Sequence, residues 1–186
     1  MKICLKKNFF ILTGGPGSGK TTLIKELKKL GYSCIEESGR RIIQKQVKKR
    51  GEALPWKNAE KFRDLMFLQD LLQWKHAPYE NSPVFFDRGF LDSIAYSKLV
   101  SLEILKNMDY AARHLRYNSL VFIAPPWKEI YCNDIERKQS FAEAKATYES
   151  IKKTYKNYGY KLIEIPKKRV WERVDFILHQ IALALE

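Results

Sequence analysis

The sequence FFILTGGPGSGKTT occupies residues 9–22, and its segment from Gly14 to Thr21 fits the pattern G-x-x-x-x-G-K-[ST]. An apolar, β-favouring run precedes the pattern, and a segment with the apolar spacing of a helix follows it. In such a strand–turn–helix unit the glycines let backbone N–H groups approach phosphate oxygens, and the helix start adds the positive end of its dipole. The stretch therefore predicts a phosphate-binding loop (P-loop) that holds a nucleoside triphosphate; the alternative is a purely structural glycine-rich turn.

The residues of this loop have distinct expected roles. Lys20 is expected to reach the terminal phosphates, and the Thr21 hydroxyl to hold Mg²⁺. ATP and Mg²⁺ are accordingly the expected cofactors, although the loop does not distinguish ATP from GTP. The residues expected to bind the nucleotide are Gly14, Gly15, Pro16, Gly17, Ser18, Gly19, Lys20, Thr21 and Thr22.

Short apolar runs alternate with longer amphipathic segments along the chain, which predicts a parallel sheet covered on both faces. We therefore expect an α/β, three-layer P-loop fold with a five-stranded parallel sheet. The five expected strands are residues 9–13, 33–36, 84–87, 120–124 and 160–165.

The intervening segments carry helix signals. Apolar residues from Leu23 to Leu30 form one stripe that ends at Gly31, a typical C-cap. Ser140 and Glu143 form a capping box before an apolar stripe that closes at Gly159. Residues 56–75 and the segment after Pro166 are also expected to be helical.

The length and composition limit the number of domains, the cysteine chemistry and the kinds of partner that the chain can have. The chain has 186 residues, a length typical of one domain, and no apolar run approaches the roughly 20 residues of a membrane helix. Its three cysteines form neither a disulfide framework nor a zinc pattern. We expect a single cytoplasmic domain, 1–186, without a membrane span. The formal net charge of +13 favours anionic partners, and the phosphates of a small nucleotide satisfy it as well as nucleic acid does.

The third expected strand ends in Asp87, and Arg88 follows it. Ligands of open parallel sheets bind beyond the carboxyl ends of the strands, so Asp87 should face the phosphates. There it would bind Mg²⁺ through water or accept a proton from an attacking hydroxyl; the alternative is an acidic N-cap.

ATP-hydrolysing motors carry glutamate where Arg88 stands, and a small GTPase would show Asn-Lys-x-Asp after the fourth strand, where this chain has Ala124-Pro125-Pro126-Trp127. Neither class fits.

Several segments together resemble a known group of kinases. Residues 87–96, DRGFLDSIAY, resemble the Asp-Arg segment of thymidylate and deoxynucleoside kinases, and residues 14–20 are similar to the adenylate kinase loop. With residues 37–40, ESGR, the chain resembles a small "AAA domain" ATPase and kinase family related to nicotinamide riboside kinases. This resemblance implies the strand order 2-3-1-4-5, a catalytic acidic residue at Asp87 and an arginine, Arg88, that holds acceptor or phosphate groups.

The resemblance also implies an arginine-bearing lid, here at about 127–139, with Arg137 as the catalytic arginine that neutralises the migrating phosphoryl group. A solvated basic turn is the alternative. Glu37 and Arg40 follow the second strand on the acceptor side, where they would hold sugar hydroxyls and a phosphate, or form an ion pair at a helix start. Asp92 either orients Arg88 or binds the acceptor. Because Asp92 replaces the serine of thymidylate kinases, thymidylate itself is disfavoured as the acceptor.

The leading hypothesis is a Mg²⁺-dependent P-loop phosphotransferase that transfers the γ-phosphate of ATP to a nucleoside, a nucleotide or a similar small acceptor. Two alternatives remain at this point. One is a regulatory NTPase that signals to a partner, and the other is a polynucleotide 5′-kinase, which the basic charge permits.

Overall fold

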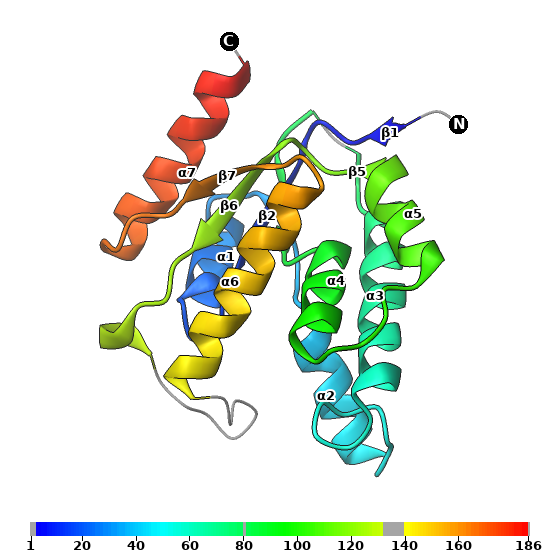
Figure 1. Ribbon diagram of the computed structural model, residues 1–186. Coiled ribbons are helices and arrows are strands. Elements are labelled where there is room, and N and C mark those ends of the chain that lie inside the picture. The colour runs from blue at the N-terminus through cyan, green and yellow to red at the C-terminus, as the bar shows by residue number, and fades with distance from the viewer. Residues whose placement is uncertain (1–2, 80, 132–139, 186) are drawn as a thin grey trace.

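A computed structural model describes residues 3–79, 81–131 and 140–185 of the chain (Figure 1). The strands are β1 (Cys4–Leu5), β2 (Phe9–Gly14), β3 (Ser33–Ile35), β4 (Val84–Asp87), β5 (Leu115–Arg116), β6 (Leu120–Ala124) and β7 (Lys161–Glu164). The helices are α1 (Lys20–Lys29), α2 (Ser38–Lys48), α3 (Ala59–His76), α4 (Phe90–Leu99), α5 (Lys106–His114), the 3₁₀ turn η1 (Lys128–Ile130), α6 (Phe141–Asn157) and α7 (Val170–Leu185).

Five strands form one parallel sheet in the order β3-β4-β2-β6-β7. Counted along the five expected strands this order is 2-3-1-4-5, so both the α/β fold class and the strand order are confirmed. β2 is central, and all six of its residues are buried because helices cover both of its faces. The P-loop therefore leaves the sheet from a fully buried central strand.

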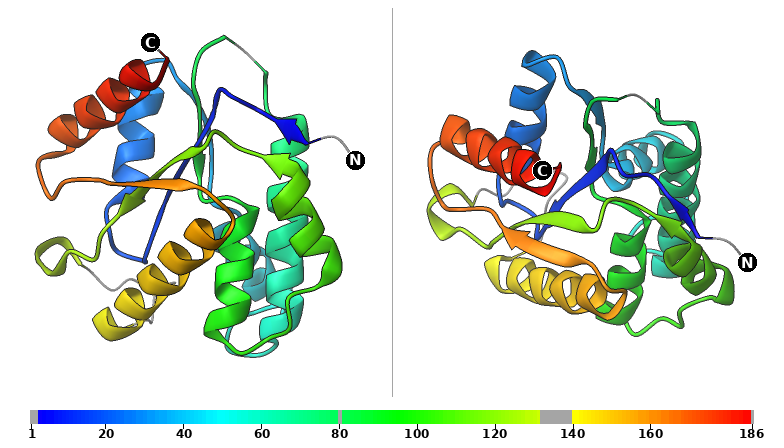
Figure 2. Two further views of the ribbon diagram at one scale, coloured as in Figure 1. Left: turned by 45° about the horizontal axis from the view of Figure 1, so that its top comes forward. Right: turned by 90° about the horizontal axis from the view of Figure 1, so that it is seen from above.

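Helices cover both faces of the sheet and make three layers (Figure 2). These layers follow from the alternation of side chains along the strands. Phe10 and Leu12 of β2 pack with α1 and α7 on one face of the sheet. Phe9 and Ile11 point to the other face, where they join a core formed with α3, α4, α5 and α6. Two apolar cores thus hold the sheet edge from which the P-loop and the ends of β3 and β4 emerge.

The start of α6 shows how local sequence signals determine an element. Ser140 Oγ accepts a hydrogen bond from the Glu143 amide at 3.2 Å, and Glu143 Oε2 accepts one from the Ser140 amide at 2.6 Å. The predicted capping box is therefore confirmed. Gly159, which follows the helix, has a φ of +76°, a value that glycine adopts at little cost.

Some expected boundaries were wrong. The helix expected over 56–75 begins at Ala59, because Asn58 caps it by accepting a hydrogen bond from the Lys61 amide. Leu30 is 56% exposed, so the buried stripe of α1 ends at Leu27. The short parallel pair β1–β5 was not expected, since two-residue strands carry no alternation to detect. No helix in the described part of the chain is long and apolar enough to cross a membrane.

Candidate active site

The P-loop wraps around the ammonium group of Lys20, the first residue of α1. Lys20 is only 5% exposed, and its Nζ donates hydrogen bonds to the carbonyl oxygens of Gly14 at 3.0 Å and Gly15 at 2.8 Å. Burial, followed by the charge of Arg88, lowers the pKa of Lys20 to about 7. Thr21 and Thr22 are exposed at the mouth of the loop and line a cavity, as expected of residues that face a ligand.

Two glycines of the loop are required by what packs against them. Gly17 has a φ of +71°, and a Cβ there would lie 2.4 Å from the Tyr131 ring. Gly19 has a φ of +80°, and a Cβ there would lie 2.8 Å from Nη1 of Arg173 in α7. Neither position accepts a side chain without displacing a neighbour. Tyr131 and Arg173 thus support the loop from outside. Arg173 was not predicted from the sequence, and Tyr131 was predicted only as part of the expected lid segment, 127–139.

The carboxyl end of β4 places Asp87 beside the loop. Asp87 is 7% exposed, and no donor in the described part of the chain lies within hydrogen-bond distance of its Oδ1. Burial, followed by the negative charge of Glu37, raises the pKa of Asp87 to about 6. The N-cap of α4 is Gly89, so the alternative interpretation of Asp87 as a helix cap was wrong.

Arg88 lies at the centre of a partly buried ion-pair network. Its Nε donates to Glu37 Oε1 at 3.0 Å, and its Nη1 donates to Asp92 Oδ1 at 2.9 Å. Its backbone has a φ of +72°, which is strained for a residue with a side chain and is typical of functional sites. Burial alone would lower the pKa of Arg88, but Glu37 and Asp92 outweigh burial and raise it above its usual value. Arg88 therefore stays charged.

Asp92 has most of its hydrogen-bonding capacity occupied within the protein. Besides Arg88, it accepts hydrogen bonds from Thr13 Oγ1 at 2.6 Å, from the Tyr155 hydroxyl at 2.6 Å and from the Gly89 amide at 3.2 Å. Such a carboxylate fixes the position of Arg88. The geometry favours this interpretation over direct contact with an acceptor.

Glu37 lies at the other side of Arg88, directly before α2. Burial alone would raise the pKa of Glu37, but Arg88 and then Lys20 outweigh burial and lower it below its usual value. The ion pair of Glu37 with Arg88 connects the ends of β3 and β4, so Glu37 is more than part of a local pair at a helix start. Both Glu37 and Arg40 line the same cavity as the P-loop.

This cavity has a volume of about 810 Å³ and runs from the P-loop to the space between α2, α3 and α4. Its far end is mainly apolar: the rings of Phe62 and Tyr96 meet edge to face at 5.6 Å, and Met66 lies beside them in the lining. The P-loop thus shares one cavity with a hydrophobic chamber. Apolar and aromatic side chains of the chamber include Ile43, Pro55, Trp56, Phe62, Met66, Tyr96 and Leu99.

One acidic side chain in this chamber was missed by the sequence interpretation. Asp70 of α3 lines the cavity, is 6% exposed, and accepts a hydrogen bond from the Ser38 hydroxyl. Burial raises the pKa of Asp70 to about 8. A signal was present: Asp70 lies between Phe67 and Trp74 on the buried face of α3, where the spacing calls for an apolar residue.

The lid assignment concerns a part of the chain that the structure covers only partly. Arg137, like residues 132–139 as a whole, lies outside the described residues. Within the described part, η1 and Tyr131 follow β6 and lie against the loop, through the contacts of Ile130 with Gly19 and of Tyr131 with Gly17.

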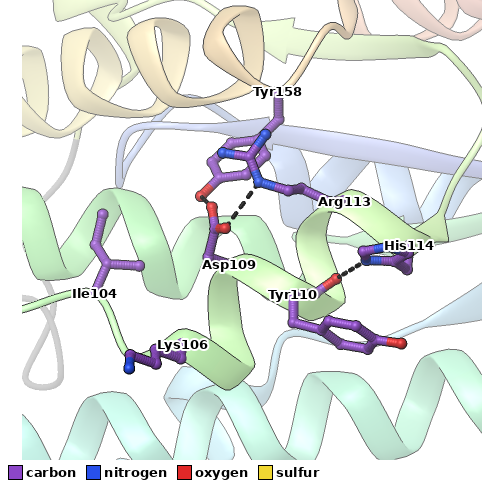
Figure 3. A pocket seen from close by; sticks show the side chains of 7 residues that line it. All are labelled: Ile104, Lys106, Asp109, Tyr110, Arg113, His114 and Tyr158. Atoms are coloured by element: carbon purple, nitrogen blue, oxygen red, sulfur yellow. Dashed lines mark hydrogen bonds and ion pairs between the residues drawn. The ribbon is translucent and has the colours of Figure 1, made fainter. Parts of the chain in front are cut away.

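A second, shallower pocket of about 470 Å³ lies beside α5, away from the P-loop (Figure 3). Its one carboxylate is already paired: Asp109 accepts hydrogen bonds from Arg113 at 2.8 Å and from the Tyr158 hydroxyl at 2.7 Å. Nothing in its lining points to chemistry.

Comparisons with known proteins agree with this geometry. A family model described as an AAA domain matches residues 9–173. Among solved structures, deoxyadenosine kinase from M. mycoides, with its products dCMP and dCDP bound, superposes with a TM-score of 0.65 at 16% identity, covering 94% of this chain and 98% of that one.

Two further kinases have the same fold. Thymidylate kinase from Ehrlichia chaffeensis has a TM-score of 0.61 at 14% identity, with 95% of this chain and 98% of that chain covered. Shikimate kinase from Aquifex aeolicus has a TM-score of 0.54 at 19% identity, with 94% and 96% covered. No curated protein matches the sequence significantly. At these identities the solved structures establish the fold and not the acceptor.

Proposed function

Because the chain belongs to this AAA domain family of P-loop proteins, we propose that it transfers the γ-phosphate of ATP to a small acceptor in a Mg²⁺-dependent reaction. The observation that carries the proposal is the single cavity that joins the P-loop to an apolar chamber. A protein that only hydrolysed ATP would need no chamber for a second molecule. The cavity instead suits two reactants that meet at the carboxyl ends of β3 and β4.

The phosphate end is occupied by groups suited to a triphosphate. Lys20 and the backbone amides of the loop would bind the β- and γ-phosphates, and Thr21 would hold Mg²⁺ together with Asp87, directly or through water. The buried Asp87 oxygen without a partner fits this role, because a metal ion or its water would satisfy it. The ion would neutralise the charge that develops on the phosphates.

In the proposed reaction the acceptor hydroxyl oxygen attacks the γ-phosphorus, and the bond from that phosphorus to the β–γ bridging oxygen breaks to release ADP. The hydroxyl proton passes to a carboxylate, for which Asp87 and Glu37 are the two candidates on either side of Arg88. Arg88, held by Asp92, would bind the acceptor or the migrating group. Arg40 would bind the acceptor from α2, and Arg137 would act from the lid.

The chamber supports a nucleoside or nucleotide as the acceptor. Aromatic and apolar side chains favour a flat ring, while Asp70 and Ser38 supply polar atoms at one wall. Deoxyadenosine kinase and thymidylate kinase, which share the fold, are named for acceptors that carry such a ring. Shikimate, the acceptor named for another neighbour, is smaller and more polar.

The alternatives are a regulatory NTPase and a polynucleotide 5′-kinase. The run of Lys45, Lys48, Lys49 and Arg50 lies exposed at the end of α2, so the basic charge there is solvated and open to an anionic partner. An apolar chamber gives no support to a polynucleotide acceptor. We therefore favour a small molecule over nucleic acid as the acceptor. The cytoplasm remains the proposed location of the protein.

An acceptor screen with γ-labelled ATP tests the proposal. Nucleosides, nucleoside monophosphates, shikimate and 5′-hydroxyl oligonucleotides are offered in parallel, with Lys20→Ala as the blank. Label transfer to a nucleoside or nucleotide that is lost in Lys20→Ala supports the proposal. Hydrolysis without transfer to any acceptor would favour the regulatory NTPase, and transfer only to oligonucleotides would favour the polynucleotide kinase.

A further inference from the structure

Arg173, in the first turn of α7, is a buried cation whose charge is not balanced within the described part of the chain. The residue is 2% exposed, and no carboxylate among the described residues lies within ion-pair distance of its guanidinium. Its neighbour Glu172 is engaged with Lys168 and with the Arg169 amide. Burying an unpaired charge costs stability, so such a residue calls for an explanation.

The guanidinium is directed at the P-loop. Arg173 Nη2 donates a hydrogen bond to the Ser18 carbonyl oxygen at 3.1 Å, and Nη1 lies 2.8 Å from the position that a Cβ would take on Gly19. The Trp127 ring covers the guanidinium at 5.7 Å, which separates it from water. Its Nε is buried and has no hydrogen-bond partner in the described part of the chain. The charge thus sits directly behind the turn that presents the last amides of the loop.

We infer that Arg173 is a positioning residue of the nucleotide site: it fixes the Ser18–Gly19 turn and supplies positive charge from behind the loop that the bound phosphates neutralise. In the absence of phosphate, Arg173 of α7 adds a second basic side chain, besides Lys20, against one short loop. A bound polyphosphate anion balances both. This inference rests on nucleotide binding by the P-loop and is independent of which acceptor is phosphorylated.

Two consequences distinguish this role from simple packing. Removing the charge should weaken the binding of any polyphosphate, since the charge acts on phosphate and not on the base. The same change should not destabilise the ligand-free protein, because an unpaired buried cation is itself unfavourable. A residue that served only packing would show the opposite combination.

The experiment compares Arg173→Met and Arg173→Gln, which remove the charge, with Arg173→Lys, which keeps it. Arg169→Gln is the matched control, because Arg169 is an exposed arginine one turn earlier at the start of the same helix. Affinities for MgADP and for inorganic tripolyphosphate are measured by calorimetry without any acceptor, and melting temperatures are measured with and without ligand. A failure of phosphoryl transfer would therefore leave this test intact.

We expect both neutral variants to bind MgADP and tripolyphosphate roughly 10-fold more weakly, a loss typical of one attenuated charge–charge interaction. Arg173→Lys should show less than half of that loss of affinity on a logarithmic scale. The affinities of Arg169→Gln for both ligands should change little. The ligand-free melting temperatures of the neutral variants should equal or exceed that of the wild type.

Three outcomes would overturn the inference. One is loss of MgADP affinity with unchanged tripolyphosphate affinity, which would show that Arg173 acts on the base of the nucleotide and not on its phosphates. Another is equal loss in Arg169→Gln, which would indicate general electrostatics. The third is failure of both neutral variants to fold, which would show that the ligand-free fold itself requires the guanidinium.

Discussion

Asp87 and Glu37 are two carboxylates on either side of Arg88, and isosteric amides separate their roles. Asp87→Asn removes the charge proposed to serve the metal ion or the acceptor proton, so single-turnover transfer should slow by about 10²–10⁴. ATP affinity should change less, because Lys20 and the loop amides remain. Since burial already raises the pKa of Asp87, the amide should fold normally.

Glu37→Gln provides the comparison in the same assay. Its amide oxygen still accepts from Arg88, but the ion pair is lost. If Asp87 is the principal group, Glu37→Gln should mainly weaken acceptor binding and raise the acceptor KM. The reverse pattern, with near-normal turnover in a folded Asp87→Asn protein, would transfer the catalytic role to Glu37.

Asp70 gives a prediction about pH and stability. Its pKa of about 8 in the folded protein lies far above the value of about 4 in an unfolded chain, so between these values the folded state binds more protons. The free energy of unfolding contributed by Asp70 therefore falls as pH rises from about 4 to about 8. Asp70→Asn cannot ionise and should be more stable than the wild type by roughly 1–3 kcal/mol at pH 9, with a much smaller difference at pH 5.

Urea denaturation at pH 5, 7 and 9 measures this difference. A constant gap between the two proteins at all three values would contradict the assigned burial of the Asp70 carboxyl.

At the residue scale the sequence predicted the groups that a motif defines, and it missed those that only packing brings in. Lys20 and Asp87 were predicted because a loop pattern and the end of a neighbouring strand place them on the same side of the sheet. Arg173 follows β7 by several residues, and nothing local links it to the loop. Tyr131 lies in the segment expected to form the lid, 127–139, but its packing against Gly17 was not predicted. Asp70 was detectable only as a polar residue on an apolar helical face.

At the scale of elements, the contact between the P-loop and Tyr131, which directly follows η1, can be tested with two glycine substitutions. Gly17 and Gly31 both have positive φ, so alanine at either position should cost about 1–2 kcal/mol in backbone strain. A Cβ at Gly17 would also collide with Tyr131, whereas a Cβ at Gly31 has nothing within 4 Å. Gly17→Ala should therefore weaken MgADP binding at least several-fold, while Gly31→Ala should only lower the melting temperature. Equal MgADP affinities in the two variants would show that the Tyr131 ring moves aside for the new Cβ without any effect on nucleotide binding.

The long elements were predictable because several signals agreed on each of them. The helix from Phe141 to Asn157 had a capping box, an unbroken apolar stripe and a closing glycine. The β1–β5 pair and α5 had none of these, since their geometry depends on contacts between segments far apart in sequence, such as Lys6 with Arg116. The start of α3 was misplaced because Trp56 reads as part of the helix until Asn58 is recognised as its cap.

At the scale of the whole molecule, the net charge of +13 makes a prediction about salt. Nucleotide turnover should fall only modestly as salt rises, since a small ligand meets few charges at a partly buried site. Binding of a polynucleotide through six to ten phosphates would instead fall by about 10³–10⁵ between 50 and 200 mM salt. Titrations of MgADP and of a single-stranded oligonucleotide over this range distinguish the two. Oligonucleotide binding that stays tight at 200 mM would revive the polynucleotide hypothesis.

All the segments assigned here to chemistry leave the sheet from the edge at which its parallel strands end, and the turns at the opposite edge only return the chain. Gly31 and Gly159 lie in two of those returning turns, and both face open space. Length variation there changes neither cavity nor loop, so these turns are where this fold can accept a reporter peptide or a fused module. The same separation leaves one end of the sheet open to attachment while the opposite end carries the proposed reaction.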